Sequence, residues 1–400
     1  MKPGWEVKAL GEVATIINGG TPKSEISAYW DGDVDWLTPK DMGRLDGHLV
    51  HVTPRRITRE GLAKCSARQV PAQSVIMSTR APIGHLAINT VPMAFNQGCR
   101  GMVPGDKLDT KFLFYVLSAN VQALDDLGTG TTFKELSAGC LKSFPFPLPP
   151  LDEQKRIVAI LDAAFDGLSR ARAHTETNLQ NARELFLRSI ECEFELLAET
   201  HERQTVGEIA AIKGGKRLPK GEKTVATQTP FPYISIKDFN DQGSVDIAGI
   251  DYLLPATRDA IKNYIISSDD LYISIAGTIG KTGIVPPELD GANLTENAAR
   301  MVFKEAVNNE YVYFFTLSAD FQDQAGLNTR TAAQPKLALE RLKTISVPIA
   351  PLIEQIEMAG KFRSLRDQTQ QIEAHYRAKL ADLDALRQAL LQKAFAGELT

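Results

Sequence analysis

The residue types most suggestive of chemistry lie in a short glycine-rich segment, Gly277–Thr282, with the sequence Gly-Thr-Ile-Gly-Lys-Thr. Such a segment cradles nucleotide phosphates when another glycine stands five residues before the Gly-Lys-Thr and a helix follows directly. Ile275 occupies the position of that glycine, and Pro286 and Pro287 follow too closely for the helix to form. The segment therefore predicts the turn of a β-hairpin rather than an ATP site.

Acidic residues alternate at Asp31, Asp33 and Asp35, as they do at the start of a calcium-binding loop. The remaining ligands of such a loop are missing, so a turn that leads into a strand explains the pattern better. The four cysteines predict neither a zinc site nor a disulfide framework, because they form no Cys-x-x-Cys pair and have no clustered histidine. We therefore expect no bound metal.

The sequence also lacks the motifs of enzymes that modify DNA. An adenine methyltransferase carries a loop such as Asn-Pro-Pro-Tyr or Asp-Pro-Pro-Tyr beside the target base, and neither occurs in the 400 residues. A lone Gly-x-Gly within Leu127–Phe133 has neither the strand before it nor the helix after it that a cofactor site needs. We therefore predict no catalytic residues and no cofactor.

Composition describes a globular protein of more than one domain. Hydrophobic residues make up 43% of the chain and charged residues 24%, and 400 residues exceed what one core usually organises. No apolar run suits a membrane span or a secretory signal, so we expect a cytoplasmic protein. The net charge of −4 means that any affinity for DNA must come from local basic patches or from a partner.

The elements that would position a site are encoded twice. Leu10–Lys23 returns as Val206–Lys220, beginning 196 residues later, and four further pairs of similar segments follow in the same order. These pairs are Val34–Met42 with Phe231–Phe239, Val75–Ile88 with Leu271–Val285, Phe112–Gln122 with Tyr311–Gln322, and Pro147–Ile157 with Pro348–Met358. The sequence therefore predicts a tandem duplication of a unit of roughly 200 residues.

Each copy ends in a proline-free stretch with apolar residues at helical spacing, from Leu151 to about Ala198 and from Leu352 to about Phe395. A helix of ~45 residues would be roughly 65–70 Å long, which exceeds the width of a domain of ~150 residues. We therefore expect the two helices to pair as an antiparallel coiled coil with pseudo-twofold symmetry. The predicted class is α+β, with mixed α/β domains at 1–148 and 200–348 and long spacer helices at 149–199 and 349–400.

The chain resembles the specificity subunit of type I restriction–modification enzymes over essentially its whole length. The resemblance rests on GEVATIINGGTPK, YWDGDVDWLTPKDM, STRAPIG and PLPPLDEQKRI of the first copy, on the SIAGTIG turn of the second and on the C-terminal LLQKAFAGEL. Such segments occur in the same order in both copies, with a long helix after each. It implies a non-catalytic subunit with two target-recognition domains that read the halves of a split, asymmetric sequence in double-stranded DNA. It also implies two methyltransferase (modification) subunits, which modify adenine, and ATP-dependent restriction subunits as partners.

Positions shared by the two copies cannot distinguish two different half-sites, so they should serve the fold, the turns or partner binding. Glu153 and Gln154 match Glu354 and Gln355 in this way and are candidates for partner binding. The second copy matches the family pattern less closely than the first. Thr295–Arg300 stands where the first copy has Phe95–Arg100, and Pro348–Met358 lacks the basic pair Lys155-Arg156 of Pro147–Ile157.

Basic residues are the candidates for DNA binding. Lys40 with Lys237 and Arg100 with Arg300 are basic in both copies and could hold phosphates. Base readers are expected where the copies diverge, in the basic clusters Thr53–Arg68 and Lys213–Lys223 and at the two glycine turns. The full set is Lys23, Lys40, Arg55, Arg56, Arg59, Arg80, Arg100, Lys213, Lys216, Arg217, Lys220, Lys237, Lys281 and Arg300.

Two alternatives remain open at this point. Each basic cluster is also what a solvated charged loop looks like. The whole chain could likewise be a coiled-coil protein–protein adaptor that does not bind DNA.

Overall fold

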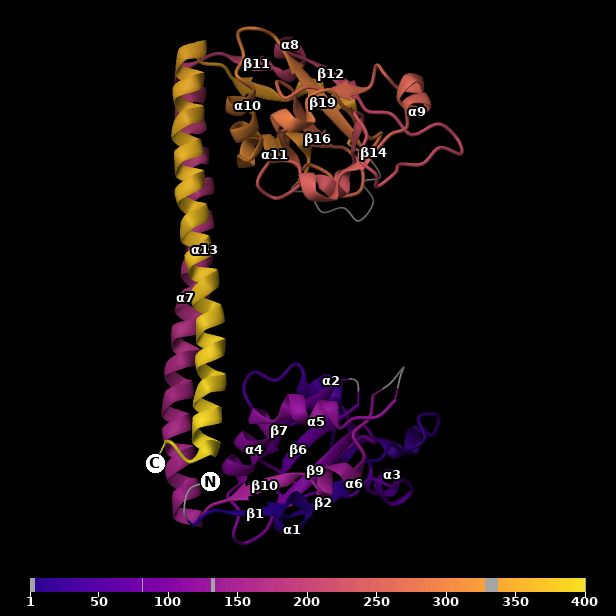
Figure 1. The fold of residues 1–400 in the computed structure, drawn as a ribbon, viewed down its shortest axis with the longest axis vertical. Helices are drawn as coiled ribbons and strands as arrows, with labels where there is room; N and C mark the ends of the chain where they lie inside the picture. The colour runs from indigo at the N-terminus through magenta and orange to yellow at the C-terminus, as the bar shows by residue number, and fades with distance from the viewer. Residues whose placement is uncertain (1–3, 81, 131–133, 328–336, 400) are drawn as a thin grey trace. The chain divides into compact units, whose positions relative to one another are not determined.

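The computed structural model describes residues 4–80, 82–130, 134–327 and 337–399. The chain forms two compact units, residues 1–175 with 378–400, and residues 176–377. Each unit holds one mixed α/β domain together with part of each of two long helices (Figure 1). The predicted α+β class and the pairing of the two helices are confirmed.

The α/β domain of the first unit is built on a five-stranded sheet with strand order β2-β9-β6-β7-β4, a three-stranded sheet β5-β3-β8 and a ribbon β1-β10. Its elements are β1 (Glu6–Ala9), α1 (Leu10–Val13), β2 (Ala14–Asn18), β3 (Trp30–Leu37), α2 (Pro39–Met42), β4 (Leu49–Val50), β5 (Arg56–Ile57), α3 (Arg59–Ala63), β6 (Val75–Thr79), β7 (Ile83–Asn89), β8 (Ala94–Phe95), β9 (Cys99–Pro104), α4 (Thr110–Ala119), α5 (Val121–Asp126), α6 (Ala138–Lys142) and β10 (Pro145–Leu148).

The α/β domain of the second unit repeats this plan with strand orders β12-β19-β16-β17, β14-β13-β18-β15 and β11-β20. Its elements are β11 (Arg203–Thr205), α8 (Val206–Ile209), β12 (Ala210–Gly214), β13 (Pro232–Ile234), β14 (Asp251–Tyr252), α9 (Pro255–Ala260), β15 (Ile265–Ile266), β16 (Leu271–Ser274), β17 (Thr282–Ile284), β18 (Ala292–Leu294), β19 (Ala298–Phe303), α10 (Asn309–Thr316), α11 (Ala319–Ala325), α12 (Leu339–Thr344) and β20 (Ser346–Pro348).

Equivalent local signals start equivalent elements in the two domains. Thr38 and Asp41 form a reciprocal capping box at α2, and Ser235 and Asp238 form the same box in the second domain. The helices α4 and α10 begin at matching polar caps, Asp109 and Asn308, and their apolar side chains are almost all buried.

The glycine-rich segment Gly277–Thr282 contains a hairpin turn, as expected. β16 pairs antiparallel with β17, and Gly277 and Gly280 between them have positive φ angles of 74° and 89°. Thr282 lies in β17, so no helix follows the turn and nucleotide phosphates would have no helix N-terminus to bind.

The long helices are α7 (Leu151–Thr200) and α13 (Leu352–Ala396). In the first unit Arg172 of α7 donates a 2.6 Å hydrogen bond to Asp384 of α13. In the second unit Arg183 of α7 pairs with Glu373 at 2.8 Å. In the second unit Arg183 contacts Glu373 and the later residue Phe194 stacks on the earlier residue Phe362. In the first unit Phe165 likewise contacts Arg387, and the later residue Arg172 contacts the earlier residue Asp384. The two helices therefore pair antiparallel in each unit.

Each helix pair completes the core of the domain in its unit. In the first unit Ile157 and Leu161 of α7 and Leu391 of α13 are buried with Phe112 of α4. In the second unit Phe194 of α7 and Phe362 of α13 are buried with side chains of α10. Burial of these apolar faces, at about 25 cal/mol per Å², attaches each domain to its part of the helix pair. Among the described residues, no helix has the length and apolar character needed to cross a membrane.

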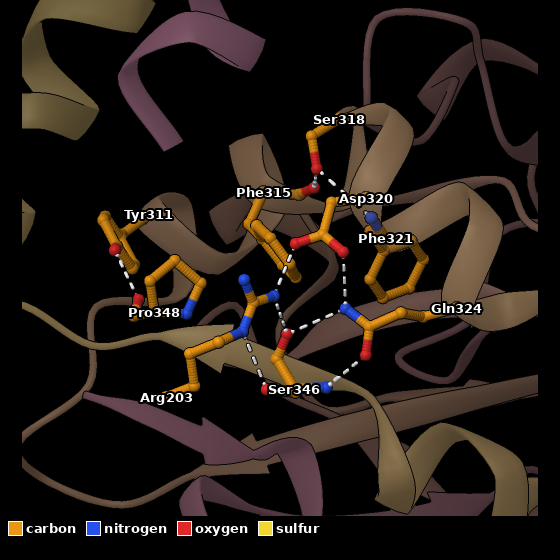
Figure 2. Close-up of polar contacts among 9 residues, drawn as sticks. All are labelled: Arg203, Tyr311, Phe315, Ser318, Asp320, Phe321, Gln324, Ser346 and Pro348. Atoms are coloured by element: carbon orange, nitrogen blue, oxygen red, sulfur yellow. Dashed lines mark hydrogen bonds and ion pairs between the residues drawn. The ribbon is translucent and has the colours of Figure 1, made fainter. Parts of the chain in front are cut away.

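A polar network fastens the second domain just beyond the end of α7 (Figure 2). Arg203 donates to the Ser346 carbonyl at 2.7 Å and pairs with Asp320 of α11 at 2.5 Å. Gln324 bridges the same partners, since its Nε2 donates to Asp320 at 2.8 Å and its Oε1 accepts from the Ser346 backbone at 2.7 Å. These bonds hold the β11-β20 ribbon against α11. Separately from this network, Tyr311 donates to the Pro348 carbonyl at 2.6 Å.

Candidate nucleic-acid interface

Two loops meet at one end of the large sheet in the first domain. One loop follows β2, and the other precedes β9. A Cβ added to Gly19 would lie only 1.9 Å from the Asn96 carbonyl oxygen, so no side chain fits there. The Gly20 amide donates to Phe95 at 2.9 Å, and the Thr21 hydroxyl donates to the Gln97 side chain. We call these two loops, residues 19–23 and 96–98, the first loop pair.

Two tryptophans of β3 support the first loop pair. The Trp36 indole donates to the Gly20 carbonyl at 2.9 Å, and the Trp30 indole donates to the Lys23 carbonyl at 3.2 Å. The Arg55 guanidinium lies 4.0 Å from the centroid of the Trp30 ring and 5.2 Å from that of Trp36. Stacking on an aromatic face orients the planar guanidinium without neutralising its charge.

The other arginines near Arg55 are balanced by the alternating aspartates. Arg56 pairs with Asp35 at 3.2 Å, and Arg59 pairs with Asp33 at 3.1 Å. These contacts explain the acidic alternation without calcium, and the described residues hold no group of three or more side chains that could bind a metal ion. Of these three arginines, Arg55 is therefore the one that forms no ion pair within the described residues.

Arg80 and Arg100 share a single carboxylate. Arg80 contacts Glu135 at 2.6 Å and Arg100 contacts it at 3.6 Å, while Arg100 also donates to the Gln97 carbonyl of the first loop pair at 3.0 Å. Burial lowers the pKa of the Arg100 guanidinium and Glu135 raises it, and an arginine remains protonated throughout. The three groups carry a net charge of +1 beside the loop pair.

The second domain contains the same arrangement with different side chains. A Cβ at Gly215 would lie 2.0 Å from the Thr295 carbonyl oxygen, and the Lys216 amide donates to Leu294 at 2.9 Å. Arg217 pairs with Glu296 at 3.0 Å. We call these loops, residues 215–222 and 295–297, the second loop pair. A cavity of about 610 Å³ opens beside it, lined by residues 217–222 with Tyr233 and Glu296.

Aromatic side chains again support this loop and one of its cations. The Tyr233 hydroxyl donates to the Lys216 carbonyl at 3.5 Å, as Trp36 does to Gly20 in the first domain. The Lys216 ammonium lies 5.3 Å from the centroid of the Tyr264 ring. Lys213 and Lys220 are exposed on the strand and loop that flank it.

Two predicted contacts of the second domain are engaged within the protein. Lys237 binds Asp251 at 2.8 Å, and this hydrogen bond raises the pKa of Lys237. Lys281 binds Asp241 at 2.6 Å and lowers the pKa of the Asp241 carboxyl. Lys40 and Lys23, in contrast, are exposed and form no ion pair within the part of the chain that the structure describes.

The equivalence predicted for Arg100 and Arg300 is wrong by one residue. Arg100 pairs in register with Met77, whereas Arg300 pairs with Tyr272 and Ala299 with Ile273, the counterpart of Met77. A shift of one residue turns a strand side chain to the opposite face of the sheet. Arg300 accordingly binds Asp270 at 2.7 Å with 14% of its side chain exposed, and it serves the fold.

The prediction for the shared glutamines also needs correction. Gln154 is fully buried, accepts from the Asp109 amide at 2.8 Å and donates to the Pro149 carbonyl at 2.8 Å. Gln355 is equally buried and accepts from the Asn308 amide at 2.9 Å. Neither amide can reach a partner, so the shared glutamines tie each helix start to its domain. Glu153 is buried as well, and only Glu354, which lies 3.5 Å from His201, is exposed.

Comparisons with known proteins identify the class. The model of the type I restriction modification DNA specificity domain matches residues 2–177 and 199–381. The MjaIX specificity subunit of Methanocaldococcus jannaschii is 24% identical over 99% of this chain and 93% of its own length. The EcoR124I/EcoR124II specificity subunit of Escherichia coli is 31% identical over 42% of each chain.

Solved structures share the fold along the whole chain. A chain from a structure of a type I restriction–modification system gives a TM-score of 0.79 at 18% identity and covers 100% of this chain and 99% of that one. The HsdS subunit from Thermoanaerobacter tengcongensis gives a TM-score of 0.56 at 18% identity, with 100% and 98% covered.

The chain belongs to the type I restriction–modification DNA specificity family. It is a specificity subunit, the non-catalytic component that recognises the DNA target of the system.

Some site residues carried no signal in the basic-residue pattern. Glu135 lies far in sequence from both of its arginines, and Thr21, Gln97 and Glu296 are uncharged or acidic. Trp36 and Tyr233 could have been found, because they align in the repeated segments and both are aromatic hydrogen-bond donors.

Proposed function

We propose that the two α/β domains each read one half of a bipartite, asymmetric target in double-stranded DNA. The observation that carries this proposal is the loop pair, which occurs in both domains with the same backbone contacts and different side chains. A conserved frame with divergent side chains suits two readers that dock alike and recognise different sequences.

The cations beside the loop pairs supply the affinity. In the first domain these are Lys23, Lys40, Arg55, Arg80 and Arg100, and in the second they are Lys213, Lys216, Arg217 and Lys220. Contacts of lysine and arginine with phosphates release counterions, so these local patches can bind DNA although the chain as a whole is acidic. Arg56, Arg59, Lys237, Lys281 and Arg300 each pair with a carboxylate of their own and lie outside the loop pairs, so they are left out of the set. Arg217 belongs to the second loop pair, and Arg80 and Arg100 share one carboxylate, so these three are kept.

The partners we propose are two adenine methyltransferase (modification) subunits and the restriction subunits of the same system. The long helices offer apolar surface for such an assembly, since Leu185 and Leu196 of α7 are 67% and 58% exposed and Ile353 of α13 is 73% exposed. Leu185 and Leu196 line one surface hollow together with Cys192, and a contiguous apolar patch of this kind suits a protein–protein contact. A complex that modifies DNA in a bacterial or archaeal cell acts in the cytoplasm, which is the location we propose.

A map of methylated adenines tests the proposal. The DNA would come from cells that express this chain with its cognate methyltransferase subunit, and from matched cells that lack only this chain. We expect a split, asymmetric motif that disappears when the chain is omitted. A complex that assembles but produces no motif dependent on the chain would instead favour the adaptor function.

A further inference from the structure

The two loop pairs make one equivalent side-chain contact. Gly19 and Gly215 meet the carbonyl oxygens of Asn96 and Thr295, so the first loops are offset by 196 residues and the facing loops by 199. With these offsets Thr21 corresponds to Arg217, and Gln97 corresponds to Glu296. The Thr21–Gln97 hydrogen bond and the Arg217–Glu296 ion pair are therefore the same contact made with different chemistry.

The Arg217 side chain is oriented but remains available. Its Nε donates to Glu296 at 3.0 Å, while 84% of the side chain is exposed. Glu296 is itself fixed by a 3.1 Å hydrogen bond from Thr295. Among the described residues the two terminal nitrogens of Arg217 have no hydrogen-bond partner. These nitrogens form the two-pronged donor that matches O6 and N7 of guanine in the major groove.

In the equivalent contact of the first domain, the side chain on the facing loop, Gln97, offers a different pattern. Its Oε1 accepts from Thr21, which fixes the amide and leaves a second lone pair on that oxygen. The Nε2 group remains a donor, and the side chain is exposed. A glutamine amide that both donates and accepts matches N7 and the N6 amino group of adenine.

The loops that carry both side chains are held by the domain. The glycine contacts leave no room between the loops, and Trp36 or Tyr233 binds the carbonyl of the residue before Thr21 or Arg217. A side chain on such a support loses little additional freedom when it binds, which favours discrimination between bases.

We propose that this contact is the base-reading position of each domain, with Gln97 reading adenine in one half-site and Arg217 reading guanine in the other. The proposal rests on the proposed function, because it assumes that each domain reads one half-site. It assigns specificity to one position in each domain and leaves the remaining cations to the phosphates.

Variants of the full chain, assembled with the cognate methyltransferase subunit, test this assignment. The readouts are the methylation motif in cells and the binding of duplexes that carry the target or one changed base pair. Arg217→Ala should lower discrimination for one guanine in one half-site by roughly 10- to 100-fold and leave the other half-site unchanged. Arg217→Lys keeps the charge and should lose the same discrimination with a smaller loss of affinity.

Gln97→Ala should relax one adenine in the opposite half-site. The matched control is Arg59→Ala, since Arg59 is 86% exposed and held through Nε by one carboxylate at 3.1 Å, as Arg217 is, but lies outside the loop pair. It should leave both half-sites unchanged. Lys220→Ala should weaken binding to all sequences alike.

Two results separate the proposals. A wild-type chain that directs no motif would contradict the proposed function. A wild-type motif that persists unchanged in assembled Arg217→Ala, Arg217→Lys and Gln97→Ala complexes would overturn the base-reading assignment alone. Relaxation at a base other than guanine or adenine would also overturn it.

Discussion

Arg55 stacks on Trp30, with the guanidinium carbon 4.0 Å from the ring centroid, while Trp30 donates its indole hydrogen to the Lys23 carbonyl. One tryptophan therefore positions both a cation and a loop of the first loop pair. The neighbouring Arg59 is also exposed but forms an ion pair with Asp33. Arg55 and Arg59 therefore allow a direct comparison between an arginine stacked on an aromatic ring and an arginine in an ion pair.

Arg55→Ala should weaken the binding of the assembled complex to target DNA by about tenfold. The loss of one phosphate contact should also reduce the slope of log K against log salt by about 0.9. Titrations of target duplexes at several salt concentrations would measure both quantities. Arg59→Ala should change affinity less than twofold, and equal effects of the two substitutions would show that the stacking on Trp30 has no functional consequence.

Glu135→Gln should tighten binding to DNA of any sequence. The substitution removes the one negative charge between Arg80 and Arg100, so the local charge rises from +1 to +2 and the salt slope should steepen by up to ~0.9. The same change leaves the largely buried Arg100 without its carboxylate, and we expect unfolding free energy to fall by about 1–3 kcal/mol. Urea denaturation and salt-dependent titrations would measure the two effects, and unchanged affinity would show that neither arginine faces DNA.

Gln154→Ala should destabilise the first unit without altering partner surfaces. The substitution leaves the Asp109 amide and the carbonyls of Lys107 and Pro149 without their bonds, at about 2–4 kcal/mol in total. Chemical denaturation would measure the loss. Glu354→Ala, at the exposed residue beside the equivalent Gln355, is the control and should cost less than about 0.5 kcal/mol. A stable Gln154→Ala chain that fails to assemble would restore the partner-binding interpretation.

The duplication, the α+β class and the paired helices could all be predicted from the sequence. The order of the repeated segments and the helical spacing of the apolar residues remain recognisable even though the two copies differ at most positions. The sequence also located the Gly277–Thr282 hairpin, since Ile275 and two prolines excluded the alternative. These features depend on residues close together in the chain or on a repeated segment, and either can be recognised from the sequence alone.

The sequence could not supply contacts between distant residues. Arg100 and Arg300 were matched because both are arginines. The register of a strand depends instead on which backbone groups pair, and an insertion of one residue shifts that register. Arg56 and Asp35 are 21 residues apart, and nothing in their spacing distinguishes Arg56 from the unpaired Arg55. Which cation remains available to DNA is therefore a property of the folded domain.

The helix register makes the spacing of half-sites testable. Arg172 pairs with Asp384 in the first unit, and Arg183 pairs with Glu373 in the second, so 11 residues of α7 correspond to 11 residues of α13. Eleven residues are also close to three helical turns. A joint deletion of residues 173–183 and 373–383 therefore preserves both the antiparallel register and the rotation of each helix.

This double deletion shortens each helix by about 16 Å, because each residue contributes about 1.5 Å of rise. If the helices set the distance between the two readers, the complex should no longer methylate the motif with its original gap. A shortening of about 16 Å equals about 5 base pairs at ~3.4 Å each, which is about half a turn of DNA. The motif should therefore be lost, or it should return with a shorter gap that turns both half-sites toward the readers, while the half-site sequences stay the same. Deleting residues 173–183 alone is the control, since it breaks the register with α13 and should abolish methylation. A double-deletion complex that methylates the original motif with its original gap would exclude the helices as the spacer, because the readers would then be positioned by their partners.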